Sequence, residues 1–214
     1  MKASLTLAET GAMLRQVAQG MIASQDLLSE ADRVIGDGDH GVGMRRGFEA
    51  VLAALDSQEF ADLKEVFFKT GMALITSVGG ASGIIFGTWF TMGGMGLAGK
   101  QVFDSQALFL LLQGGAKGIQ QRGKATAGDK TMLDALLPAC AALPQDLSCI
   151  YLTEALRLVV EAAKTGAEST KEMVARVGKA KSLGPRALGY IDPGALSASL
   201  ILEFMQWYVE SLPE

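Results

Sequence analysis

The sequence predicts an all-α fold, a bundle of about eight antiparallel, up-and-down helices. Apolar residues recur at intervals of three and four along most of the chain, which is the spacing of a helix that buries one face. No convincing stretch alternates apolar and polar residues with a period of two, so we expect no sheet. Short glycine-rich segments separate the helical stretches, and short connections join antiparallel neighbours in a bundle.

Each predicted helix rests on its own apolar stripe. Residues 5–29 place Met13, Val17 and Met21 on one face. The other helices follow the same rule and are expected at residues 44–55, 63–74, 84–97, 104–121, 131–142, 147–164, 168–178 and 192–212. The last helix has a clear start, because Asp192 can cap the free N–H groups and Pro193 suits the first helical position.

Composition limits the class of protein. The 214 residues, 49% of them hydrophobic, suffice for one well-buried core, and we expect a single domain over residues 1–214. A formal net charge of −4 without a Lys/Arg cluster argues against nucleic-acid contacts, which need a basic surface. Cys140 and Cys149 lack metal-ligand spacing and are expected to be reduced core thiols. No targeting segment is recognisable, so we expect a cytoplasmic protein.

One uncharged stretch has to be tested as a membrane span. Between Lys69 and Lys100 there is no charged residue, and this length nominally exceeds what a bilayer requires. However, the stretch contains nine glycines and has no basic flank that would orient it. We therefore expect two buried helices broken at Gly79 and Gly80, and no association with a membrane.

The densest group of chemically active residues lies between the first two predicted helices. Asp32, Asp37 and Asp39 are spaced by five and two on a backbone freed by glycines, so their carboxylates can converge. Magnesium prefers such oxygen ligands together with substrate phosphates. An EF-hand is excluded, because Gly41 and Phe48 stand at the fifth and twelfth positions, where ligands are needed. The alternative is a tight turn whose aspartates cap the second helix.

A second candidate is Gly-Gly-Ala-Ser-Gly at residues 79–83, before the 84–97 helix. Free backbone amides at a helix N-terminus bind anions, and the Ser82 hydroxyl adds a donor. It is not a Walker loop, because no Gly-Lys-Ser/Thr follows. The alternative interpretation is close helix packing through small residues.

A third candidate is the loop of residues 122–132. Asp129 is expected to cap the helix that follows, and Lys124 or Lys130 could face a phosphate. The alternative is that both lysines are ordinary solvated surface.

The fourth candidate is the long loop of residues 178–194. Arg186 could contact a phosphate, which the planar guanidinium suits, or pair with a surface carboxylate. In an up-and-down bundle these four loops would share one end, which favours a joint nucleotide site.

Taken together, these motifs resemble a known family. Gly-Asp-Gly-Asp-His-Gly, Gly-Gly-Ala-Ser-Gly, Gly-Asp-Lys-Thr-Met and Asp-Pro-Gly are similar to segments of the nucleotide-binding L subunit of phosphotransferase-system-dependent dihydroxyacetone kinase, and the similarity runs from the first helix to the last. The resemblance implies an eight-helix barrel that binds ADP or ATP at one end, with two Mg²⁺ ions held by Asp32, Asp37 and Asp39. It further implies a nucleotide lined by His40, Gly41, Val42, Gly43, Ala81, Ser82, Gly123, Met132, Arg186, Asp192, Pro193 and Gly194.

The resemblance also implies a reaction that needs partners. ATP on this subunit would donate its γ-phosphoryl group to dihydroxyacetone, or a similar short ketose, held by a separate K subunit. A phosphohistidine on an M subunit would then regenerate ATP from the bound ADP. Such transfer depends on positioning and charge neutralisation, so we assign no general base to this chain; Arg186 is the one catalytic candidate, through a phosphate contact. The sequence leaves a homodimer open.

Two departures from the family pattern, Ala81 and Pro185, leave another short ketose or polyol open as the acceptor. Two other functions also stay open. The chain could be a non-enzymatic ADP-sensing subunit that regulates a partner, or His40, the only histidine, could carry a phosphoryl group.

Overall fold

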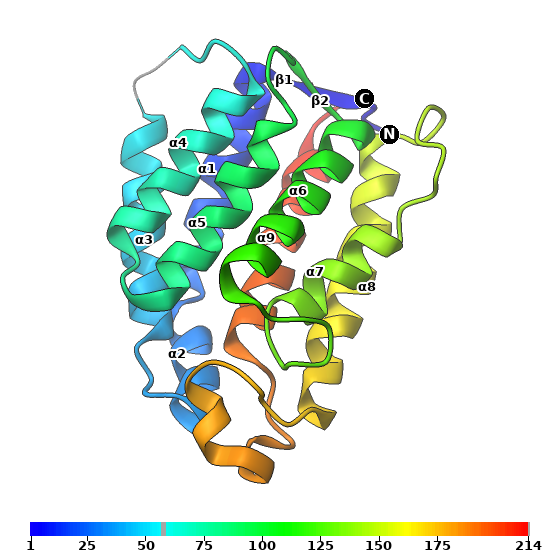
Figure 1. The fold of residues 1–214 in the computed structure, drawn as a ribbon. Helices are drawn as coiled ribbons and strands as arrows, with labels where there is room; N and C mark the ends of the chain where they lie inside the picture. Colours follow the sequence, from blue (N-terminus) through cyan, green and yellow to red (C-terminus); the bar gives the residue numbers. More distant parts are fainter. Residues whose placement is uncertain (57–58, 214) are drawn as a thin grey trace.

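The computed structural model describes residues 1–56 and 59–213 and consists almost entirely of helices (Figure 1). The helices are α1 (Leu7–Ala23), α2 (Gln25–Ile35), α3 (His40–Leu55), α4 (Leu63–Ser77), α5 (Gly80–Met95), α6 (Ser105–Gly123), α7 (Leu133–Ala141), α8 (Leu152–Ser169) and α9 (Pro193–Ser211). Two 3-10 elements, η1 (Thr170–Glu172) and η2 (Lys179–Ala187), precede α9. The predicted all-α bundle is confirmed.

Eight of the described helices form a closed ring. Along the chain, α3 packs on α4, α4 on α5, and so on to α8 on α9, while α1 packs on both α3 and α9. The short α2 lies at one end of this barrel, near η2, and the two termini lie at the other end (Figure 1). The barrel interior is filled by aromatic and aliphatic side chains, among them the fully buried Trp89, Phe48, Phe67 and Phe90.

The uncharged stretch between Lys69 and Lys100 forms two helices, as expected. It is divided between α4 and α5, and the break falls at Gly79 and Gly80, whose φ angles are +85° and +58°. Such left-handed angles suit glycine, which has no Cβ to clash. In the described part of the chain, no helix is both long and apolar enough to cross a membrane.

The expectation of no sheet is wrong in one small detail. Strands β1 (Ser4–Thr6) and β2 (Val102–Asp104) pair antiparallel, with Leu5 opposite Phe103. Both of these side chains are fully buried. Three residues are too few to show a period of two, and the pairing joins segments that are far apart in sequence.

Some helix boundaries also differ from those predicted. The predicted 5–29 helix is divided at Ser24. The Ser24 hydroxyl donates a hydrogen bond of 2.8 Å to the Gly20 carbonyl oxygen, which also accepts a hydrogen bond from the Ser24 N–H. This competition ends α1, and α2 then continues to Ile35. The helix expected at 168–178 is wrong: η1 ends at Glu172, and Met173 is extended. The fourth predicted loop in turn contains η2.

Candidate functional site

The four glycine-rich loops meet at one end of the barrel. They surround a pocket of about 730 Å³ whose wall includes residues from α2, α3, α5, α9 and the loops before α7 and η2. The predicted residues on this wall are Asp32, Asp39, His40, Val42, Gly43, Ala81, Ser82, Gly123, Met132, Asp192, Pro193 and Gly194. The four loops therefore lie together at one end of the barrel, as predicted.

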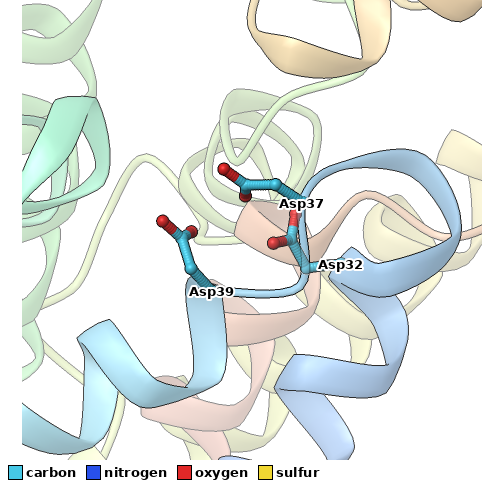
Figure 2. Close-up of side chains that lie close together, drawn as sticks. All are labelled: Asp32, Asp37 and Asp39. Carbon is cyan, nitrogen blue, oxygen red and sulfur yellow. The ribbon is translucent and has the colours of Figure 1, made fainter.

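The three predicted aspartates lie close together (Figure 2), and Asp32 and Asp39 belong to the pocket wall. Oxygen atoms of Asp32, Asp37 and Asp39 all lie within 4.8 Å of one another, with Asp32 buried and the other two exposed. The backbone N–H of His40 donates to Oδ2 of Asp32 at 3.2 Å, which fixes that carboxylate against the start of α3. A Cβ at Gly36 would lie 2.8 Å from Cγ of Asp32, so only glycine fits this approach.

The chemistry of this trio fits a divalent cation. Three convergent carboxylates supply the hard oxygen ligands that Mg²⁺ takes, and two of them are open toward solvent. A positive group already stands among them: Nζ of Lys179 lies 2.5 Å from each carboxylate oxygen of Asp37 and 3.2 Å from Oδ1 of Asp39. Hydrogen bonds from Lys179 lower the pKa of Asp37, so this carboxyl is ionised at neutral pH.

Two helix N-termini face the pocket, and neither N-cap residue, Asp39 of α3 or Gly79 of α5, caps its own helix with a side chain. Neither α3 nor α5 has a side-chain hydrogen bond at its N-cap, whereas Asp62 and Asp104 cap α4 and α6. Free N–H groups and the positive end of the helix dipole attract anions. Ser82, in the first turn of α5, adds a hydroxyl on the pocket wall. This part of the pocket therefore suits phosphate oxygens.

His40 is a buried link between two helices. Its Nε2 lies 2.8 Å from Oγ of Ser197 on α9, and its ring lies 6.0 Å from that of Phe86. Burial lowers the pKa of His40, an effect that the nearby Asp32 and Asp39 oppose. The imidazole therefore stays neutral and joins the first turn of α3 to α9.

The loop before α7 is tied down by Lys130. This side chain is 2% exposed, and its ammonium donates to the carbonyl oxygens of Thr170 and Tyr190, both at 2.5 Å. Burial lowers the pKa of Lys130, while Asp192 and Asp134 oppose that shift. Lys130 thus holds the segment that leads into α9 against the pocket wall. Lys124 has a φ of +55° at the end of α6 and is exposed.

The prediction that Asp129 caps the following helix is wrong. Oδ2 of Asp129 accepts from the N–H and hydroxyl of Thr126 and so closes a turn inside the loop. Asp134, in the first turn of α7, accepts instead from the N–H groups of Gly128 and Thr131, at 2.5 and 2.7 Å. The loop therefore folds back on the helix start, and α7 begins only at Leu133.

Asp192 caps α9, as predicted. Its Oδ2 accepts from the backbone N–H of Ala195 at 2.8 Å, and Pro193 occupies the first helical position. Burial in the pocket wall raises the pKa of Asp192 to about 7, against the opposing effects of the Ala195 N–H and the Lys130 ammonium. A protonated carboxyl can donate a hydrogen bond into the pocket as well as cap the helix.

Two predicted nucleotide contacts are not on the pocket wall. Gly41 faces α2, where a Cβ would lie 2.6 Å from the backbone nitrogen of Ser29. Arg186 is exposed on η2, and its Nε donates 3.4 Å to the Leu183 carbonyl. Lys179, in contrast, lies on the wall, although the sequence singled out only Arg186 among the basic residues of this loop. The wall also includes residues without any motif, namely Arg46, Ile85, Phe86 and Ile119.

Comparison with known proteins identifies the family. The model of the DAK2 domain matches residues 34–206. The chain belongs to the DAK2 domain family. This DAK2 domain is 40% identical over 182 residues to the Listeria innocua "PEP-dependent dihydroxyacetone kinase 1, ADP-binding subunit DhaL", covering 85% of this chain and 86% of that one. It is 39% identical to the corresponding Escherichia coli subunit, over 84% of this chain and 86% of that one. The expected resemblance to this subunit is confirmed.

A solved structure shares the fold of this DAK2 domain. The dihydroxyacetone kinase from C. freundii, crystallised with AMP-PNP and Mg²⁺, superimposes with a TM-score of 0.72 at 25% identity. The match covers 97% of this chain and 35% of that longer chain. The barrel of helices is therefore one that a known kinase also contains.

Proposed function

We propose that this chain is the ADP-binding subunit of a phosphoenolpyruvate-dependent dihydroxyacetone kinase, a cytoplasmic protein forming one domain over residues 1–214. The observation that carries the proposal is the convergence of three carboxylates with two helix N-termini around one pocket. This combination suits a nucleotide whose phosphates arrive with Mg²⁺. The names of the Listeria and Escherichia relatives, and the AMP-PNP and Mg²⁺ of the C. freundii structure, support the same ligands.

The residues of the chain have distinct roles in this proposal. Asp32, Asp37 and Asp39 would hold two Mg²⁺ ions, which neutralise phosphate charge when bound. The first turns of α3 and α5 would donate backbone N–H groups to the phosphate oxygens. The apolar wall formed by Ile85, Phe86, Ile119 and Met132 would bury the base and exclude water.

The acceptor and the phosphate donor are assigned to partners. ATP on this chain would transfer its γ-phosphoryl group to dihydroxyacetone, or a similar short ketose, on a K subunit, and a phosphohistidine on an M subunit would restore ATP. No general base is assigned here, and the buried, hydrogen-bonded His40 is not placed to carry a phosphoryl group. Arg186, exposed on η2, stays a candidate phosphate contact, which would require η2 to change its position.

The experiment measures what the purified protein retains. We expect freshly purified chain, denatured without added nucleotide, to release about one ADP and two magnesium ions, the metal load that suits a phosphoryl-transfer site. Asp37→Asn should release neither, because one ligand of the trio has become a neutral amide. Asp26→Asn is the matched control, because Asp26 is exposed at the start of α2. This variant should retain both ADP and magnesium.

Either of two results would reject the proposal. If wild-type protein carries no ADP and does not bind added Mg-ADP, the aspartate loop is only a structural turn. Asp37→Asn that still retains ADP and magnesium would remove the metal assignment. Adding K and M subunits and measuring dihydroxyacetone phosphate then separates a kinase subunit from an ADP-sensing regulator, which would bind ADP without supporting transfer.

A further inference from the structure

One cation in the structure already lies where the proposed metal would bind. The ammonium of Lys179 lies 2.5 Å from both oxygens of Asp37 and 3.2 Å from Asp39. A divalent ion held by the same carboxylates could not share that space with an ammonium group. Binding of the ion therefore requires Lys179 to leave.

Lys179 belongs to a segment with little else to hold it. Its element, η2 (Lys179–Ala187), which we call the strap, packs through Ala180, Ala187 and the partly buried Leu183 on Ile35 at the end of α2. This small cluster is separate from the main core. Two alanine methyl groups and one partly buried leucine bury little apolar area, and segments with few buried apolar contacts open at low free-energy cost.

The two ends of the strap are better anchored than its middle. Before it, the N–H of Arg176 donates 3.1 Å to the Asp129 carbonyl, and after it the N–H of Gly189 donates 2.8 Å to the Lys171 carbonyl. Gly178 and Gly184 have φ angles of +70° and +55°, which makes them natural points for a change of backbone direction. The strap can therefore swing away while both of its ends stay in place.

We propose that Lys179 is an internal counter-ion of the aspartate trio, which holds the strap over the acidic loop until a divalent cation displaces it. This inference rests on the proposed function, because it assigns a regulatory device to the same site. In the metal-free protein the ammonium reduces repulsion between Asp37 and Asp39. When the cation binds, it takes over that task, and the strap with its exposed Lys179, Lys181 and Arg186 becomes free to move.

The test uses Mn²⁺ alone, with nucleotide-free full-length protein, and compares Lys179→Gln with Lys181→Gln. Lys181 is exposed on the same strap, so its substitution removes an equal charge from the same segment. We expect Lys179→Gln to bind Mn²⁺ about two- to fivefold more tightly, the range of an exposed ion pair. Lys181→Gln should match the wild type, because salt screens distant charges.

Hydrogen exchange of the strap amides gives a second, independent readout. In the wild type, Mn²⁺ should speed exchange across residues 179–187; in Lys179→Gln exchange should already be fast and should not respond. Asp37→Asn should also exchange fast without metal, because Lys179 has lost its main partner.

The outcomes separate the two proposals. Wild-type binding of Mn²⁺ with no change in strap exchange, or equal affinities for all three proteins, would overturn the counter-ion role and leave the metal site intact. If Lys181→Gln gains as much Mn²⁺ affinity as Lys179→Gln, the effect comes from the net charge of the strap and not from the contact of Lys179 with the aspartates. That result would also overturn the counter-ion role. If the wild type does not bind Mn²⁺, the metal site and this inference both fail.

Discussion

Replacing Asp192 by asparagine removes an ionisable group from the pocket wall while keeping a residue that can cap α9. The folded protein binds a proton at this carboxyl up to a pKa of about 7, whereas an unfolded aspartate releases it near 3.9. Between those values the folded state binds more protons than the unfolded state. The contribution of Asp192 to stability must therefore fall as the pH rises through this window.

The size of the effect follows from the width of the window. One pKa unit corresponds to about 1.4 kcal/mol. The ionisation of Asp192 should therefore lower the free energy of unfolding of the wild type by about 2 kcal/mol between pH 5 and pH 7. Asn cannot ionise, so the free energy of unfolding of Asp192→Asn should not fall in this window, and its advantage over the wild type should widen by about 2 kcal/mol between pH 5 and pH 7.

Urea unfolding of nucleotide-free protein, followed by far-ultraviolet circular dichroism at pH 5, 6, 7 and 8, measures this difference. Asp62→Asn is the matched control, because Asp62 also caps a helix, but hydrogen bonds from the N–H groups of Gly99 and Glu65 lower its pKa. Its stability gap to the wild type should therefore stay constant above pH 5. A gap between wild type and Asp192→Asn that does not change with pH would refute the reasoning.

Two further substitutions test how the loops are built. Asp62→Ala should lower the free energy of unfolding, measured by urea titration, by about 1–3 kcal/mol. The substitution removes a carboxylate that accepts hydrogen bonds from the Glu65 N–H and, at 2.7 Å, from the Gly99 N–H. Gly41→Ala should lower the melting temperature and abolish ADP retention, because the new Cβ would press on the first turns of α2. Its control, Gly11→Ala, meets no atom closer than 3.6 Å and should instead stabilise α1 slightly; equal melting temperatures for the two variants would contradict this account.

The helices and the shared end of the four loops could be predicted because their causes are local. Three-and-four spacing identifies a buried helix face, and up-and-down connectivity then places alternate loops together. Asp192 as the cap of α9 was predictable for the same reason, since Pro193 and Gly194 directly follow it. The ring order of the helices agrees with the short connections that the glycine-rich segments provide.

What could not be predicted depends on distant partners. The β1–β2 pairing buries Leu5 against a segment almost a hundred residues away, and three residues carry no readable pattern. Asp129 was assigned a capping role from its position alone, but Asp134 accepts the loop N–H groups instead. Lys179 was not singled out in the predicted loop of residues 178–194. Its carboxylate partners lie more than a hundred residues earlier in the chain.

The charges around the pocket explain why cation and phosphate should bind together. The aspartate trio by itself repels phosphate, while the positive ends of the α3 and α5 helix dipoles attract it. A divalent cation reverses the first effect without weakening the second, so each ligand improves the site for the other. Lys179 supplies a single positive charge to the same carboxylates from within the chain, and it can balance them only partly. A site arranged in this way favours a metal–phosphate pair over either ion alone, which is what a nucleotide kept bound through phosphoryl transfer requires.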